Sequence, residues 1–148
     1  MELPKLGQLL VKLDKLLDRY VDSGPGAADI AQYRAFLWDG TRKALKPLAR
    51  PARVDLRDLI GIDAIQQAVV RNTKRFIDGN KANNVLLWGE RGTGKSSLVK
   101  SLLTEFAGTD LRMVQICKHD ILTIQDLFGL LAGSSPCRFI LFIDDLSF

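Results

Sequence analysis

Residues 89–96 place three glycines, a lysine and a hydroxyl side chain at fixed spacing. They fit the pattern G-x-x-x-x-G-K-[ST] in full, as Gly89-Glu90-Arg91-Gly92-Thr93-Gly94-Lys95-Ser96. Glycines let a backbone fold so that successive amides point inward, and a helix that starts there adds the positive end of its dipole. A simple tight turn would need neither the lysine nor so many glycines. The chemistry expected here is the binding of phosphate groups.

The pattern is that of a P-loop, which assigns a role to each polar side chain. Lys95 is expected to reach the β and γ phosphates of a nucleoside triphosphate, and Ser96 to ligate Mg²⁺. The predicted ligand is ATP with Mg²⁺. The predicted nucleotide-binding residues of this loop are Gly89, Glu90, Arg91, Gly92, Thr93, Gly94, Lys95, Ser96 and Ser97.

A second chemical signal follows the apolar run of residues 139–143, which ends in Asp144 and Asp145. Two adjacent carboxylates repel each other unless a cation compensates them, and ligands of open α/β sheets sit at the carboxyl ends of strands. The arrangement is typical of a Walker B motif. Asp144 is assigned to the Mg²⁺ shell, and Asp145, together with Lys95, is a predicted catalytic residue that would orient the attacking water. For Asp145, an ordinary loop acid remains the alternative.

Three short apolar runs predict the strands that position these motifs, at residues 85–88, 113–117 and 138–143. Helices are expected between them, at residues 95–106 and 124–131. The order strand, helix, strand, helix, strand predicts an α/β fold with the parallel sheet of a P-loop NTPase.

The first part of the chain has a helical pattern instead. Apolar residues recur at three and four residue steps over residues 3–21 and again over residues 28–48, so two helices are predicted, the second with Asp39-Gly40 as an interruption. Residues 49–58 look like a connector. A further helix is expected from residue 64 to about residue 78, capped by Asp63, with Ile65, Val69, Phe76 and Ile77 facing inward. The predicted regions are a helical region, 1–53, and the front part of an ATPase domain, 54–148.

Composition excludes several classes of protein. With 148 residues, 47% of them hydrophobic, the chain can bury one core. No apolar run approaches the roughly 20 residues of a membrane-spanning helix, and charged residues interrupt the N-terminus where a signal peptide would be apolar. The expected location is the cytoplasm, with no membrane partner.

Net charge, the cysteines, the histidine and the tryptophans give little further information about function. The net charge is +4, and residues 1–57 hold eleven Lys or Arg and seven Asp or Glu, whereas residues 58–148 hold ten of each. This bias leaves a nucleic-acid surface open without supporting it. Cys117 and Cys137 have neither C-x-x-C spacing nor a nearby His pair, so buried reduced thiols are expected rather than a zinc or redox site. His119 is expected to face solvent, and Trp38 and Trp88 to pack in the core.

The sequence resembles the AAA+ ATPases and, within them, the bacterial domain-of-unknown-function family 815 of predicted AAA+ ATPases. The match is carried by residues 59–62, 72–73, 83–89, 91–100 and 139–148, and it covers residues 54–148 well. The resemblance implies that Ile60, Gly61 and Ile62 line the adenine pocket. It also implies ATP hydrolysis coupled to the remodelling of an unknown protein partner, with a homo-oligomer as one form of the full-length protein.

The chain departs from the AAA+ pattern in two ways. Many members have Asp-Glu where this chain has Asp144-Asp145, and the sensor residues, the arginine finger, the helical lid and one strand of the sheet would lie beyond Phe148. The expectation is the front part of a longer protein. Two other functions stay open: a nucleotide-gated adaptor, akin to a helicase loader, without significant hydrolysis, and a small-molecule kinase.

Overall fold

The computed structural model describes residues 27–134 and 136–144. The helix predicted over residues 3–21 lies outside these described residues, and so does Asp145.

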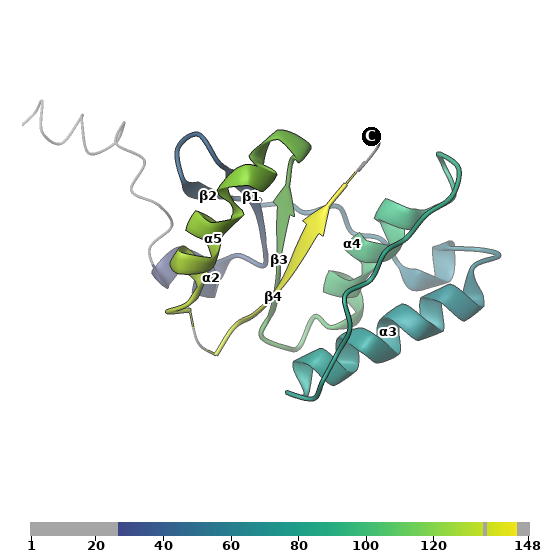
Figure 1. The fold of residues 1–148 in the computed structure, drawn as a ribbon. Coiled ribbons are helices and arrows are strands. Elements are labelled where there is room, and N and C mark those ends of the chain that lie inside the picture. Colours follow the sequence, from purple (N-terminus) through teal and green to yellow (C-terminus); the bar gives the residue numbers. More distant parts are fainter. Residues whose placement is uncertain (1–26, 135, 145–148) are drawn as a thin grey trace, which may run out of the picture.

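Four strands form one mixed sheet at the centre of the described chain (Figure 1). They are β1 (Ala35–Asp39), β2 (Ala44–Pro47), β3 (Leu111–Ile116) and β4 (Arg138–Ile143), and their order in the sheet is β2-β1-β3-β4. β1 and β4 both run parallel to β3, and β2 is antiparallel to β1. The α/β class with a mostly parallel sheet is therefore confirmed, and the sheet takes strands from both sides of the predicted region boundary at residues 53 and 54.

Helices cover both faces of this sheet. In Figure 1, α2 (Ala27–Gln32) and α5 (Ile124–Leu131) lie on one side, and α4 (Lys95–Glu105) and α3 (Asp63–Ile77) on the other. A short 3-10 helix, η1 (Leu56–Asp58), precedes α3, and a second one, η2 (Lys118–Thr123), joins β3 to α5. This is the layered arrangement that alternating strands and helices produce.

Successive side chains of a strand point to opposite faces of the sheet, so each face of this sheet has its own hydrophobic core. On the α5 side, Phe36 and Trp38 of β1 pack with Val114 and Ile116 of β3 and with Leu127 of α5. The intervening residues face α4, where Ala35, Leu111, Met113 and Phe142 pack with Leu103. A third cluster fills the contact between α3 and α4 around Val69, Leu98 and Leu102.

Two arginine side chains donate hydrogen bonds to backbone carbonyls near the ends of helices. Arg34 donates from Nη1 to the carbonyl of Leu103 at 2.7 Å and from Nη2 to that of Phe106 at 2.8 Å, at the end of α4. Arg112, which is buried, donates from Nε to the carbonyl of Ile30 in α2 at 3.0 Å. Burial, and then the charge of Arg112, lower the pKa of Arg34. The last carbonyls of a helix lack partners within the helix, and these guanidinium groups supply them.

The helix predicted over residues 28–48 is wrong, because helix α2 ends at Gln32 and a β-hairpin follows. The predicted interruption at Asp39-Gly40 marks the end of β1, because Asp39 pairs with Ala44 and residues 40–43 form the turn. The Asp39 carboxylate accepts from the amide of Arg42 at 3.0 Å, and Lys43 adopts a positive φ of 51° in the turn. Apolar residues spaced by three and four also suit two short strands, so the period alone could not separate the alternatives.

The strand predicted at residues 85–88 is also wrong, because residues 81–88 have no regular secondary structure. β4 is a terminal strand of the sheet, and the segment lies with α3 and α4 instead of beside a strand (Figure 1). A strand exists only where another strand completes its backbone hydrogen bonds. The apolar side chains are consequently exposed, Leu86 by 75% and Trp88 by 88%, so the prediction that Trp88 packs in the core is wrong as well.

The other elements predicted within the described residues are confirmed, with boundaries that shift by a residue or two. α5 and β4 span the predicted ranges, α4 ends at Glu105 and β3 begins at Leu111. α3 begins at Asp63 itself, so its N-cap is Ile62, which makes no side-chain capping bond. Of the residues expected to face inward from α3, Val69 is buried, but Ile65 is 50% exposed.

Candidate nucleotide-binding site

The glycine-rich loop lies at the start of α4 and depends on glycine for its shape. Gly89, Gly92 and Gly94 have φ values of 137°, 79° and 83°, a region that side-chain-bearing residues rarely adopt. Gly94 is the N-cap of α4 and has no side chain with which to cap that end. The amides of the first helical turn are therefore not engaged by their N-cap residue, which favours the binding of an anion there.

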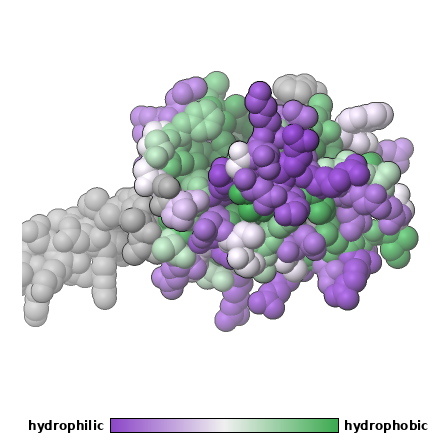
Figure 2. Space-filling model, turned by 90° about the horizontal axis from the view of Figure 1, so that it is seen from below, coloured by the Kyte–Doolittle hydropathy of each residue, from purple (hydrophilic) through white to green (hydrophobic). Residues whose placement is uncertain are grey.

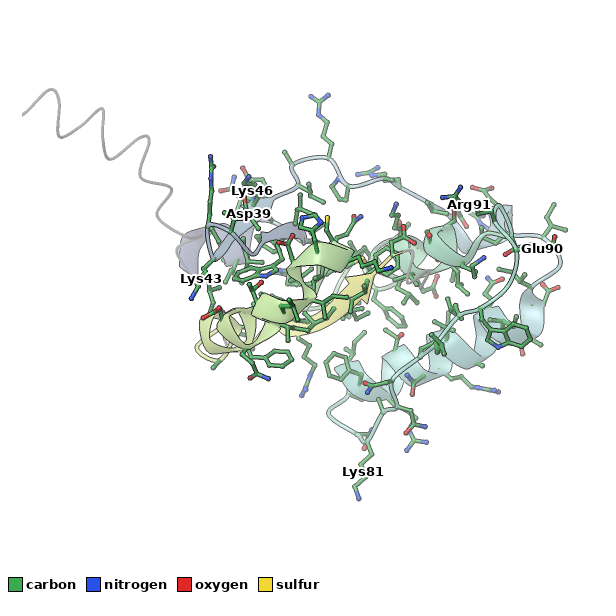
Figure 3. All side chains as sticks on the ribbon, turned by 45° about the horizontal axis from the view of Figure 1, so that its top comes forward. Asp39, Lys43, Lys46, Lys81, Glu90 and Arg91 are labelled. Atoms are coloured by element: carbon green, nitrogen blue, oxygen red, sulfur yellow. The ribbon has the colours of Figure 1, made fainter. Side chains whose placement is uncertain are left out.

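Lys95 lies folded over this loop. Its Nζ donates to the carbonyl oxygen of Gly89 at 2.9 Å, to the carbonyl oxygen of Glu90 and to Thr93 Oγ1 at 3.1 Å. Thr93 Oγ1 in turn donates to the carbonyl of Glu90 at 2.9 Å. Figure 3 shows Glu90 and Arg91 together on the outer part of the loop, far from Asp39, Lys43 and Lys46 of the β-hairpin. The ammonium group thus sits inside the loop, at the start of the helix.

The structure brings the second motif to the first. Ser96 Oγ donates a hydrogen bond of 2.6 Å to Asp144 Oδ1, and both residues are half-buried. Asp144 directly follows β4, at the carboxyl end of the parallel strands, and Ser96 is the second residue of α4. A hydroxyl and a carboxylate in contact are two oxygen ligands of the kind that Mg²⁺ takes, usually together with waters and phosphate oxygens.

The segment around Ile60 lies beside the loop, although not every side chain faces it. A β carbon built on Gly94 would lie 3.7 Å from Leu59 Cδ2, and Ile62 packs with Val69 and Leu98. Ile60 itself is 92% exposed, and Gly61 has a φ of 81°. This part of the chain therefore contributes backbone and partly apolar surface next to the start of α4.

Asp55 fixes the beginning of that segment. Its carboxylate caps η1 by accepting from the amide of Arg57 at 2.9 Å, and it pairs with the Arg57 guanidinium at 2.6 Å. The hydrogen bonds from the Arg57 side chain and amide hold the pKa of Asp55 at about 2. The cap is consequently ionised over the whole physiological range of pH.

Helix α3 anchors the chain that enters the loop. The Asn72 side chain pairs with the backbone of Asn83 in both directions, donating to its carbonyl at 2.8 Å and accepting from its amide at 2.9 Å. Arg75 Nε donates to the carbonyl of Lys81 at 3.1 Å. The Asn72 amide thus takes the place that a neighbouring strand would have, and sequence patterns alone gave no sign of this contact.

The structure also gathers three residues that the sequence interpretation kept apart. Cys117, His119 and Asp120 each offer a ligand atom, and these atoms all lie within 4.8 Å of one another. Cys117 and Cys137 are half-buried rather than buried, and His119 is exposed as expected. The sequence does contain a sign of this cluster, because three residue types that bind metals occur within four positions. A search for C-x-x-C spacing or for a pair of histidines does not detect it.

The opposite end of the molecule has a different character. Figure 2 looks at the amino-terminal ends of β3 and β4 and shows hydrophilic side chains over the centre of this face, with hydrophobic ones at its sides. A shallow cavity of about 180 Å³ lies there, lined by Ile77, Thr109, Asp110, Leu111, Pro136 and Arg138. It includes none of the predicted site residues.

Fold and site together define an α/β protein with a glycine-rich loop and a carboxylate at the carboxyl ends of its parallel strands. The comparison with protein families identifies the particular group. Residues 31–148 match the family described as "Protein of unknown function (DUF815)", and the chain belongs to this family. No curated protein and no solved structure is significantly similar to the chain. Over the described residues, no helix has the length and apolar character to cross a membrane.

Proposed function

We propose that the chain is an ATP-binding module of the AAA+ type, with the P-loop of residues 89–96 as its phosphate site and Mg²⁺ held by Ser96 and Asp144. The observation that carries the proposal is the 2.6 Å contact between Ser96 Oγ and Asp144 Oδ1. Nothing in a tight turn before a helix requires a carboxylate that follows a distant strand to meet the second residue of that helix. A shared metal ion explains why both groups are there.

Electrostatics support the same assignment. The loop offers the start of α4 and the ammonium of Lys95, both of which attract phosphate. Among the described residues, Lys95 Nζ donates to neutral oxygens of its own loop. A phosphate oxygen would make a charge-assisted bond with it, and such bonds are about twice as strong as neutral ones. A bound phosphate can therefore replace the contacts between Lys95 and its own loop with stronger ones.

The resemblance to AAA+ proteins supplies the rest of the proposal. Ile60, Gly61 and Ile62 would contact the adenine, and Asp145 would orient the attacking water. ATP hydrolysis in the full-length protein would drive the remodelling of a protein partner, in the cytoplasm. The contact between Leu59 and the start of α4 supports the adenine assignment, because it places this segment next to the loop.

A second candidate is a nucleotide-gated adaptor in which ATP occupancy changes an interface and hydrolysis is slow. One observation favours it. The segment that leads into the P-loop is outside the sheet and exposes Leu86 and Trp88, so the loop is held less firmly than catalysis needs. Small displacements of catalytic groups cost about 10²-fold in rate, whereas binding tolerates them better.

Calorimetric titration with ATP and Mg²⁺ tests the nucleotide site. Lys95→Ala should remove most of the ATP affinity and leave the fold intact, because the hydrogen bonds of Lys95 to described residues all lie within its own loop. Lys74→Ala is the matched control, since Lys74 is an exposed residue of α3 that pairs with Asp78. Equal ATP affinity in folded Lys95→Ala and Lys74→Ala proteins would refute the phosphate assignment.

A further inference from the structure

Outside the nucleotide site, the end of β3 carries a second group of metal-binding side chains. Cys117, His119 and Asp120 have a thiol sulfur, an imidazole nitrogen and a carboxylate oxygen within 4.8 Å of one another. None of them belongs to the P-loop or to the pair formed by Ser96 and Asp144. Their proximity needs its own explanation.

Local backbone geometry produces the cluster. Cys117 has extended backbone angles and is the N-cap of η2, and the amide of Asp120 donates to its carbonyl at 2.9 Å. In such a turn, residues three apart lie above one another on one side. His119 then reaches back, with Nε2 at 3.2 Å from Asp120 Oδ2. The turn after β3 therefore directs all three side chains to one place.

Asp120 is held in a way that suits a ligand. It is 7% exposed, and its Oδ1 accepts from the amide of Gly40 at 3.2 Å. Its other oxygen, Oδ2, faces His119. Ligating carboxylates are commonly oriented by hydrogen bonds of this kind. Since the side chain of His119 is 79% exposed, an ion has access to the site from solvent.

The donor set indicates which ion would bind. Thiolate, imidazole and carboxylate are the ligands that proteins use for Zn²⁺, whereas Mg²⁺ takes oxygen ligands and not thiolates. Zinc–ligand bonds of about 2.0 to 2.3 Å in a tetrahedron place donors roughly 3.3 to 3.8 Å apart. The observed limit of 4.8 Å needs a small contraction of the donor set, in which His119 Nε2 already lies 3.2 Å from Asp120 Oδ2.

We propose that Cys117, His119 and Asp120 form a zinc-binding site with three protein ligands, whose fourth position is taken by water. The site lies one strand away from the nucleotide site. Ile116 of β3 pairs with Ile143 of β4, so Cys117 and Asp144 leave neighbouring strands at the same level. The two sites take different metals, because only one of them contains sulfur and nitrogen donors.

The test uses the full chain without nucleotide, titrated with ZnCl₂ by calorimetry and with CoCl₂ by absorption spectroscopy. Cobalt reports thiolate ligation directly, through a sulfur-to-metal charge-transfer band. One zinc ion per chain and a thiolate band are expected. His119→Ala and Cys117→Ser should each weaken zinc binding at least tenfold, and Cys117→Ser should remove the band.

Cys137→Ser is the matched control, because Cys137 is the other half-buried thiol and is not part of the cluster. It should keep both the band and the zinc affinity. His119→Ala keeps the test decisive if Cys117→Ser folds poorly, since an exposed side chain can be removed without disturbing the core. Absence of the band in the unmodified chain, or equal loss in Cys137→Ser, would overturn the proposal. Neither result depends on ATP, so it leaves the nucleotide assignment untouched.

Discussion

Ser96, in the first turn of α4, donates a 2.6 Å hydrogen bond to Asp144, which lies 48 positions further along the chain, directly after β4. The two residues belong to two separate sequence motifs. Their contact joins the P-loop to the carboxyl end of the parallel strands. In the proposed function, both oxygens would belong to the coordination shell of one Mg²⁺ ion.

Asp144→Asn should reduce the effect of Mg²⁺ on ATP binding more than ATP binding itself. The amide oxygen can still accept from Ser96, so the contact persists, but the negative charge that holds the metal is lost. ATP affinity measured calorimetrically with Mg²⁺ and with EDTA gives the ratio that tests this. In Asp126→Asn, which alters an exposed acid paired with Lys43, the ratio should be unchanged. A wild-type ratio in Asp144→Asn would remove Asp144 from the metal shell.

Gly92→Ala should weaken ATP binding with little change in stability. No described residue lies within 4 Å of a β carbon built on Gly92, so the obstacle that the structure shows is its φ of 79°. A side-chain-bearing residue in that region costs about 1 to 2 kcal/mol, and an exposed loop relieves this strain by changing shape, which moves its amides. The measurements are ATP affinity and the free energy of unfolding in urea.

Gly108→Ala serves as the control for that loop variant. Gly108 also has open space around it, and its φ lies outside the positive region. The control should retain wild-type ATP affinity. Equal affinities in the two variants would show that the special conformation of Gly92 is not needed for binding.

The sequence predicted the parts of the fold in which local signals and tertiary contacts agree. The helix after the P-loop, the helix over residues 124–131 and the strand over residues 138–143 all appear. Residues 85–88 and 28–48 were misassigned because their apolar residues fit more than one structure. A strand also depends on a partner elsewhere in the chain, which periodicity does not reveal.

In the candidate site too, local sequence patterns were predictive and contacts between distant residues were not. The sequence predicts a P-loop because the whole pattern lies within eight consecutive residues, and the structure gives three of these residues, Gly89, Gly92 and Gly94, a positive φ. The anchoring of Asn83 by Asn72, and the cluster of Cys117 with His119 and Asp120, depend on how separate elements or a single turn arrange side chains in space. These contacts between side chains can be recognised only in the three-dimensional structure.

Gly40→Ala should destabilise the fold by about 1 to 3 kcal/mol, the usual cost of overpacking a filled core. A β carbon at this position would lie 2.3 Å from Thr123 Oγ1 and 2.6 Å from Asp120 Oδ1. The same hydroxyl accepts from Trp38 Nε1 at 2.8 Å, so the clash would also disturb the buried tryptophan. Urea unfolding followed by tryptophan fluorescence measures the loss. Gly108→Ala should change the free energy of unfolding by less than about 0.5 kcal/mol, and equal stabilities of the two variants would contradict the steric explanation.

The last prediction concerns turnover: the 148-residue chain should bind ATP weakly and release almost no phosphate. Phosphoryl transfer needs its groups placed accurately, and an error of about 1 Å can cost 10²-fold in rate. The entry to the P-loop is held by Asn72 and Arg75 of α3 rather than by strands on both sides. Transition-state charge beyond the lysine and metal adds a further factor, since an arginine finger alone contributes about 10³ to 10⁵.

Phosphate release from the purified chain measures whether it hydrolyses ATP. Lys95→Ala is prepared in parallel to reveal any contaminating ATPase. Release that is slow and equal in both proteins is the expected result. Turnover near one per second that disappears in Lys95→Ala would correspond to a barrier of about 17 kcal/mol, which the observed anchoring of the loop should not permit. The 148-residue chain would then already be a competent catalyst, and the adaptor candidate would be excluded in favour of an ATPase.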